Sequence, residues 1–222
     1  MRLIGMLDSP FVRRVAISMQ TMGLRYEHEN LSVFSTYNAF AAINPVVKAP
    51  TLVTDSGVVL MESSLILEYL ERLAPEKSLS PPEAGAFARS QRIVGLALAA
   101  CEKSVQIVYE RNLRPSEKQH APWTDRVTAQ LHGAYRLLEA ELPPTAGWIF
   151  GPVPLQGDIT SAIAWRFSRE MIPDVVPADG YPRLAQLSVR AEALPAFLAA
   201  PFGLGRGHSR RGVLSFASSL FS

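Results

Sequence analysis

Two spacings of apolar residues alternate along the first part of the chain. Short apolar runs favour strands, and the segments between them repeat apolar residues three or four positions apart, as on one face of a helix. The resulting order is βαβαββα. The strands are predicted over residues 2–7, 26–31, 50–54 and 58–60, the helices over 10–22 and from 62 onward, and a weak helix or loop over 36–43.

Local signals mark the limits of these elements. Ser9 is suited to the N-cap of the first helix, Pro10 to its first position, and Gly23 to its end. A turn at residues 55–57 separates the third and fourth strands, and Glu62 opens the last helix of this part.

The second part of the chain predicts helices alone. Pro75, Pro81 and Pro82 interrupt the periodicity and indicate a linker. We therefore expect one domain over residues 1–76, a helical domain over 84–200 and a separate tail over 201–222. The helices are predicted over 84–112, 124–142, 158–171 and 181–194.

The tail combines two kinds of residue. Arg206, Arg210 and Arg211 lie among glycines, and an apolar stretch follows over 213–221. An anion-binding segment and a loosely held terminus both fit this composition. We expect the segment from Gly203 to contribute little to the core, as a short helix folded back toward a cleft or as a disordered end.

Composition narrows the class of protein. The chain has 222 residues, 48% of them hydrophobic, and 22 basic against 20 acidic side chains leave a net charge of +2. This balance predicts neither a nucleic-acid partner nor a membrane partner, and the chain lacks a run of about 18 apolar residues. The first apolar run is too short for a signal peptide, and Cys101 is the one cysteine, which excludes an intrachain disulfide. We expect a cytoplasmic protein without a metal site.

Three short segments carry the chemistry. Ser9 lies at a helix N-terminus, where its hydroxyl is suited to cap the helix or to stabilise a thiolate. Pro50 begins a strand, and exposed backbone beside it is able to pair with an extended ligand. Glu62 and Ser63 open a helix, whose N-terminus attracts a carboxylate. Together these features suit a small zwitterionic peptide.

These segments resemble the cytosolic glutathione transferases, in particular the serine-type bacterial and tau- or omega-like members. The resemblance covers about residues 1–198, and Met6 and Leu7 stand where tyrosine-type members carry their tyrosine. It implies an α/β plus all-α fold: a thioredoxin-like N-terminal domain followed by an all-helical domain. The matching segments are 9–15, 44–52 and 62–70.

The resemblance implies glutathione as co-substrate and assigns a role to each motif residue. Ser9 contacts the thiolate, and the Ala49-Pro50 peptide is cis, so that Ala49 turns its backbone toward the ligand. Glu62 receives the ammonium and Ser63 the carboxylate of the γ-glutamyl end. Two further residues belong to the expected site: Lys48, which reaches the glycyl carboxylate or stays solvated, and Phe34, which forms a wall where many relatives carry a basic residue.

The second part of the chain carries the expected pocket for the second substrate and the expected dimer contacts. Phe11, Tyr109 and Trp165 line the pocket unless they are ordinary core residues. A homodimer is implied, in which two surfaces face the partner. One is the helix from Ala84, through the stripe of Arg89, Arg92 and Leu96, and the other is the side of the first domain that carries the helix from Glu62.

One departure from the family concerns the helix that contains Asp158. Relatives place Ser or Thr three residues before this aspartate, whereas this chain has Leu155. Asp158 keeps its own half of the capping box, and the missing half costs about 1 kcal/mol.

The leading hypothesis is a glutathione transferase, typical of detoxification, that adds the thiolate to a small apolar electrophile. A non-catalytic adaptor or ligand carrier with the same fold is the alternative from another class. A dehalogenase or a maleylacetoacetate-type isomerase also remains open, although the isomerase pattern of two serines and a cysteine is not seen. An omega-type thiol reductase needs cysteine where Ser9 stands.

Overall fold

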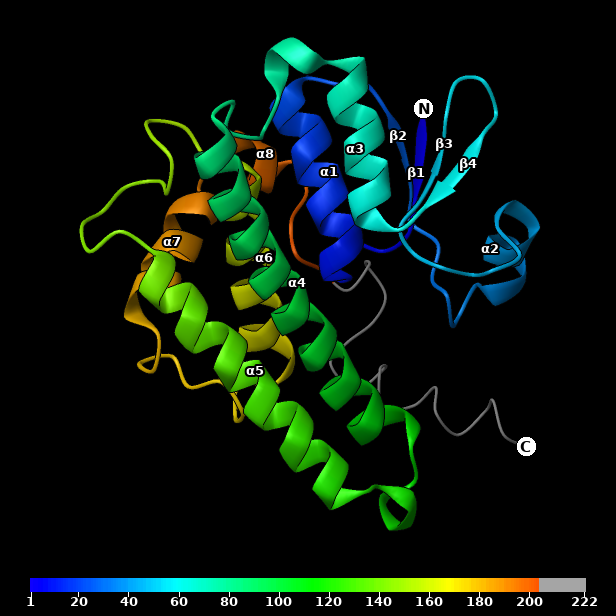
Figure 1. Ribbon diagram of the computed structural model, residues 1–222. Helices are drawn as coiled ribbons and strands as arrows, with labels where there is room; N and C mark the ends of the chain where they lie inside the picture. Colours follow the sequence, from blue (N-terminus) through cyan, green and yellow to red (C-terminus); the bar gives the residue numbers. More distant parts are fainter. Residues whose placement is uncertain (204–222) are drawn as a thin grey trace. The chain divides into compact units, whose positions relative to one another are not determined.

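The computed structural model of the chain describes residues 1–203 (Figure 1). These residues form two compact units: one comprises residues 1–79 together with 193–203, and the other comprises 80–192. The prediction of a helical domain over 84–200 therefore differs from the structure at its end. The expected tail lies outside the described residues beyond Gly203.

A four-stranded sheet organises the first unit. Its strand order is β2-β1-β3-β4, with β1 parallel to β2 and antiparallel to β3, and β3 antiparallel to β4. The predicted βαβαββα order is thus confirmed as a thioredoxin-like unit, with the first three strands shorter than expected. The strands are β1 (Arg2–Ile4), β2 (Glu27–Glu29), β3 (Thr51–Val53) and β4 (Val59–Met61).

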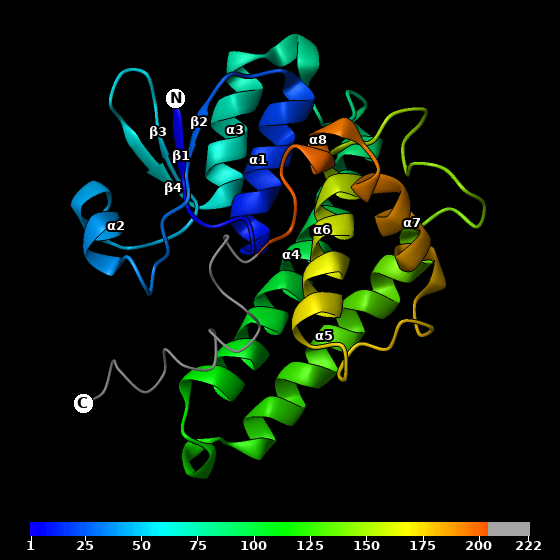
Figure 2. The same ribbon diagram turned by 180° about the vertical axis from the view of Figure 1, so that it is seen from behind.

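Helices α1 (Pro10–Met22) and α3 (Ser63–Leu73) lie side by side against the sheet, with their N-terminal ends at the same end of the unit (Figures 1 and 2). Ser9 is the N-cap of α1, and Gly23 closes the helix with φ 67°, the left-handed conformation that glycine adopts at low cost. Both end signals are confirmed. The segment predicted as a weak helix or loop forms α2 (Tyr37–Ile43), and η1 (Pro75–Lys77) follows α3.

Residues 193–203 return to the first unit because α1 carries a buried arginine. Arg13 donates its Nε–H to the carbonyl oxygen of Ala200 at 2.8 Å, and its guanidinium lies 5.5 Å from the ring centre of Phe197. Phe197 belongs to α8 (Pro195–Leu198) and is buried. These contacts attach α8 to α1.

The second unit is all-helical, as predicted. Helix α4 packs against α5 and α6, and α6 packs against α7. No helix within residues 1–203 is long and apolar enough to cross a membrane. The helices are α4 (Ala84–Leu113), α5 (Ala121–Glu141), α6 (Gln156–Met171) and α7 (Pro182–Glu192), with η2 (Ser116–Lys118) between α4 and α5.

Asp158 fixes the start of α6. Its buried carboxylate accepts the N–H of Leu155 at 3.0 Å and the N–H of Ile149 at 2.9 Å. The Leu155 side chain has no atom that could accept the N–H of Asp158, so the second hydrogen bond of a capping box is missing. The half-formed capping box is therefore confirmed. Burial raises the pKa of the Asp158 carboxyl, and the two N–H donors oppose this shift.

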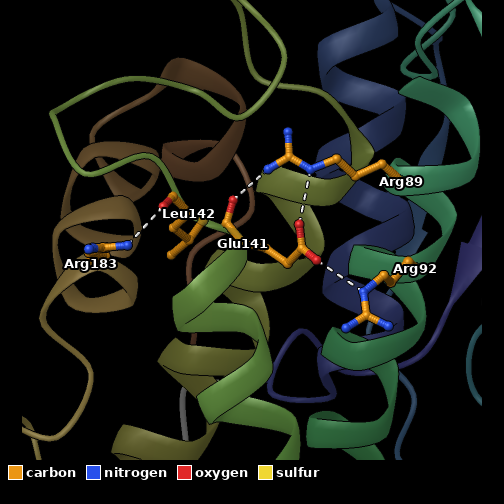
Figure 3. A network of polar contacts seen from close by, with 5 residues as sticks. All are labelled: Arg89, Arg92, Glu141, Leu142 and Arg183. Carbon is orange, nitrogen blue, oxygen red and sulfur yellow. Dashed lines mark hydrogen bonds and ion pairs between the residues drawn. The ribbon is translucent and has the colours of Figure 1, made fainter. Parts of the chain in front are cut away.

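Three arginines hold the C-terminal end of α5 (Figure 3). Arg89 and Arg92 each donate an Nε–H to the Glu141 carboxylate at 3.0 Å, and Arg89 also reaches the Glu141 carbonyl at 2.8 Å. Arg183 donates to the carbonyl of Leu142 at 3.2 Å. Unpaired carbonyls at a helix end are thereby satisfied by cations. The arginines of the predicted dimer stripe therefore pair within the chain, although about half of each side chain stays exposed.

Candidate functional site

Ser9 has the geometry of a helix cap. Its Oγ accepts the N–H of Val12 at 3.4 Å, and its carbonyl accepts the N–H of Arg13 at 3.0 Å. The hydroxyl acts as an acceptor in this cap, so its own hydrogen is left to donate elsewhere. Capping and contact with an anion are therefore compatible roles for this half-buried serine.

A buried asparagine shapes the loop before β3. Asn44 donates its Nδ2–H to Thr51 Oγ1 at 2.8 Å and accepts the N–H of Val46 at 3.1 Å. Thr51 in turn donates its hydroxyl to the carbonyl of Lys48 at 2.7 Å. The loop is thus held at both ends, and it has a left-handed residue, Val47, with φ 51°.

The Ala49-Pro50 peptide is cis, as predicted. Gly5 permits this segment to approach α1, since a Cβ on Gly5 would lie 2.6 Å from Val12 Cγ2 and 3.3 Å from the Cβ of Ala49. Gly5 also has φ 137°, which side chains rarely adopt. The glycine therefore brings the start of α1 and the cis proline together.

The start of α3 is built around the Glu62 carboxylate. Glu62 is the N-cap, with φ 75°, and its Oε2 accepts the N–H of Ser64 at 3.1 Å and of Leu65 at 3.3 Å. Its Oε1 lies 3.4 Å from the hydroxyl of Ser63. The N–H of Ser63 is a first-turn donor that this carboxylate does not take, and it remains available to a second anion.

Arg14 connects the two helix N-termini, and we did not predict it from the sequence. Its Nη1 donates to Ser63 Oγ at 3.0 Å and to Ser64 Oγ at 3.1 Å. Arg14 is 3% exposed and Ser63 is 1% exposed. The one sequence signal was the pair Arg13-Arg14 inside an otherwise apolar helix, because arginine is rarely buried unless it is paired.

The other predicted residues differ in their surroundings. In the first unit Phe11 is half-buried, Phe34 is 39% exposed and Lys48 is exposed on the loop. The roles expected for Phe34 and Lys48 stay predictions.

In the helical unit, Tyr109 and Trp165 are placed very differently. Tyr109 is 43% exposed and borders a cavity of about 380 Å³ together with residues of α4 and α5. Trp165 is 5% exposed and packs edge-on against Tyr135 and Tyr181. Trp165 therefore lies in the core of the helical unit.

The described residues contain no group of three or more His, Cys, Asp or Glu side chains that could share a metal ion. The chemistry of the first unit is instead that of two helix N-termini with hydroxyl and N–H donors at one end of a thioredoxin-like sheet. Such ends stabilise negative charge.

A thioredoxin-like unit of this kind followed by a helical unit defines the glutathione transferase fold. Residues 3–78 match the family model of the glutathione S-transferase N-terminal domain. Residues 3–78 therefore form a domain of the glutathione S-transferase N-terminal family.

Three relatives show how far the similarity extends. The chain is 29% identical over 142 residues to the GST-like protein YibF of Escherichia coli, covering 64% of this chain and 70% of that one. It is 26% identical over 205 residues to the maleylacetoacetate isomerase of Pseudomonas aeruginosa, covering 89% and 93%. A glutathione S-transferase from Methylobacterium radiotolerans, solved with glutathione sulfonate, is 28% identical, with a TM-score of 0.85 over 94% of this chain and 98% of that one.

Proposed function

We propose that the protein is a serine-type glutathione transferase, which binds glutathione in its first unit and adds the thiolate to small apolar electrophiles. One observation carries the proposal: α1 and α3 present their N-terminal ends at the same end of the first unit, and Arg14 joins them through Ser63. The glutathione sulfonate complex of the Methylobacterium relative supports glutathione as the ligand.

The thiol and the γ-glutamyl end of glutathione are assigned to different helices. Ser9 donates its hydroxyl hydrogen to the thiolate, which lowers the pKa of a thiol from its usual value near 8.5. The γ-glutamyl carboxylate binds the hydroxyl and N–H of Ser63, and the ammonium faces the Glu62 carboxylate. The backbone of Ala49, turned by the cis peptide, pairs with the cysteinyl segment.

Binding and chemistry are tested in sequence. The protein is expected to be retained on immobilised glutathione and then to conjugate a chromogenic electrophile. Glu62→Ala and Ser63→Ala are expected to weaken glutathione binding in titration calorimetry, because both residues hold the end remote from the sulfur. Retention without turnover on a panel of electrophiles would favour the adaptor or ligand carrier, and lack of any glutathione affinity would overturn the proposal.

A glutathione-dependent isomerase is the second candidate. It is favoured by the similarity to the Pseudomonas isomerase, which extends over 93% of that enzyme. The sequence Ser9-Pro10-Phe11 lacks the two serines and the cysteine expected of that activity. Maleylacetoacetate turnover at a rate exceeding conjugation would move the assignment to the isomerase.

We also propose that the protein is a homodimer that uses the β4 edge of the first unit. Apolar side chains are exposed there: Val58, Val59, Met61 and Leu65. An exposed edge strand with apolar neighbours is a surface that proteins usually cover. Light scattering at micromolar concentration is expected to give the dimer mass for the wild type and the monomer mass for Leu65→Glu. A monomeric wild type would refute this part of the proposal.

A further inference from the structure

Arg14 has an unusual position for a charged side chain. It is buried within α1, and its guanidinium donates to two hydroxyls in the first turn of another helix. A guanidinium has donors and no acceptor, so toward Arg14 each of these serine oxygens acts as an acceptor.

This arrangement determines where the Ser63 hydrogen points. Because Oγ of Ser63 accepts from Arg14, its hydrogen must be donated to another group. The acceptor in this structure is Glu62 Oε1 at 3.4 Å, a long distance for a bond between a hydroxyl and a carboxylate oxygen. A ligand carboxylate at normal distance would be a better acceptor for the same hydrogen.

The neighbouring groups are already engaged. Glu62 Oε2 holds the N–H groups of Ser64 and Leu65, which keeps the Glu62 side chain against the helix. The hydroxyl and N–H of Ser63 are therefore the pair of donors that the first turn offers to an anion.

We propose that Arg14 is a positioning residue, which orients the Ser63 hydroxyl as a donor to the α-carboxylate of the γ-glutamyl group. This inference rests on the proposed function. Arg14 does not touch the ligand; it acts through Ser63. A merely structural role, in which Arg14 joins α1 to α3, predicts instead that every glutathione-like ligand is affected alike.

Two ligands separate these roles. Glutathione has the α-carboxylate, and 4-aminobutyryl-cysteinyl-glycine lacks it but retains the ammonium, the thiol and the glycyl end. Titration calorimetry on the full chain is expected to show that Arg14→Met weakens glutathione about tenfold, the value of a charge-assisted hydrogen bond, and weakens the analogue less than about twofold.

A double mutant and a matched control complete the test. Ser63→Ala is expected to weaken glutathione similarly, and Arg14→Met in the Ser63→Ala background to add little, because the residue through which it acts is gone. Ser64→Ala removes the other hydroxyl bonded by Arg14 and is expected to leave glutathione affinity unchanged.

The other outcomes of these titrations distinguish failure of the positioning role from failure of the proposed function. Unchanged glutathione affinity in Arg14→Met, or equal weakening of both ligands, would overturn the positioning role and leave the proposed function standing. Lack of glutathione binding by the wild type would overturn both. If Arg14→Met does not fold, as judged by circular dichroism, Arg14→Lys is compared with the same two ligands. Lysine keeps the charge but lacks the planar guanidinium whose Nη1 donates to both hydroxyls, so the same selective loss is expected.

Discussion

Asn44 and Thr51 are joined by a buried hydrogen bond of 2.8 Å, and the Thr51 hydroxyl donates a second hydrogen bond to the carbonyl oxygen of Lys48. Both side chains are almost fully buried. The loop that carries the cis proline is therefore fastened by polar side chains.

Asn44→Ala tests whether these hydrogen bonds hold the loop. It removes the donor to Thr51 and the acceptor for the N–H of Val46, and a buried group left unpaired costs about 1–3 kcal/mol. We expect lower thermal stability and weaker glutathione binding, measured by calorimetry. The matched control is Asn38→Ala, since Asn38 is exposed on α2; equal effects of the two changes would contradict the role of the loop.

Ser9 allows capping and chemistry to be separated. Ser9→Ala is expected to lose about 1 kcal/mol of stability and tenfold or more of the conjugation rate at neutral pH. Asparagine also caps helices but has no hydroxyl, so Ser9→Asn is expected to restore stability without restoring the rate. Chemical denaturation and a conjugation assay measure the two effects, and a fully active Ser9→Asn would show that Ser9 is only a cap.

Gly5→Ala is expected to destabilise the first unit. The added Cβ would lie 2.6 Å from Val12 Cγ2, and φ at this position is 137°. Thermal melting is expected to show the loss, and Val12→Ala is expected to relieve part of it, so that the double mutant loses less than the two single losses combined. Purely additive losses would mean that backbone strain, and not the clash, limits this position.

Glu141 predicts a pH dependence of stability. The hydrogen bond from Arg89, with a further contribution from Arg92, lowers the pKa of this carboxyl below its ordinary value of 4.5. The stabilisation is therefore present above pH 4.5 and is lost as the pH falls through the lower folded-state value.

Glu141→Gln measures this contribution. It keeps the backbone bond from Arg89 to the Glu141 carbonyl and removes only the charge. We expect a loss of about 0.5–1 kcal/mol at pH 7, as for partly exposed ion pairs, which shrinks with added salt and with acid. Glu117→Gln, at an exposed position of η2, serves as the control. A difference between Glu141→Gln and wild type that does not change from pH 7 to pH 3 would contradict the ion-pair account.

Several features of the fold followed from the sequence because they depend on a few neighbouring residues. Ser9 and Gly23 end α1 through their own side chain and backbone, and the order of strands and helices follows from spacing along the chain. The cis peptide at Pro50 was predicted from the family resemblance and is present.

The buried face of α4 was only partly predicted. Counted in steps of three and four along the sequence, Phe87, Gln91, Val94, Cys101 and Val108 fall in one row. Val94, Cys101 and Val108 are buried, but Phe87 and Gln91 are exposed. Small residues occupy much of the true face, because α5 and α6 pack close to it. Spacing identifies a helix, whereas the packing of its neighbours decides which of its sides is covered.

The sequence by itself determined the order of the strands and helices in the first unit, the limits of α1, and which short segments resemble a glutathione site. Only the tertiary structure decided that Arg13 would hold residues 193–203 on α1 and that Arg14 would bond to Ser63, 49 positions away. Hydropathy alone places an arginine in water, and a buried arginine is stable only when distant groups supply acceptors for its donors. Those acceptors come together when the chain folds, which is why the link between α1 and α3 could not be predicted from the sequence.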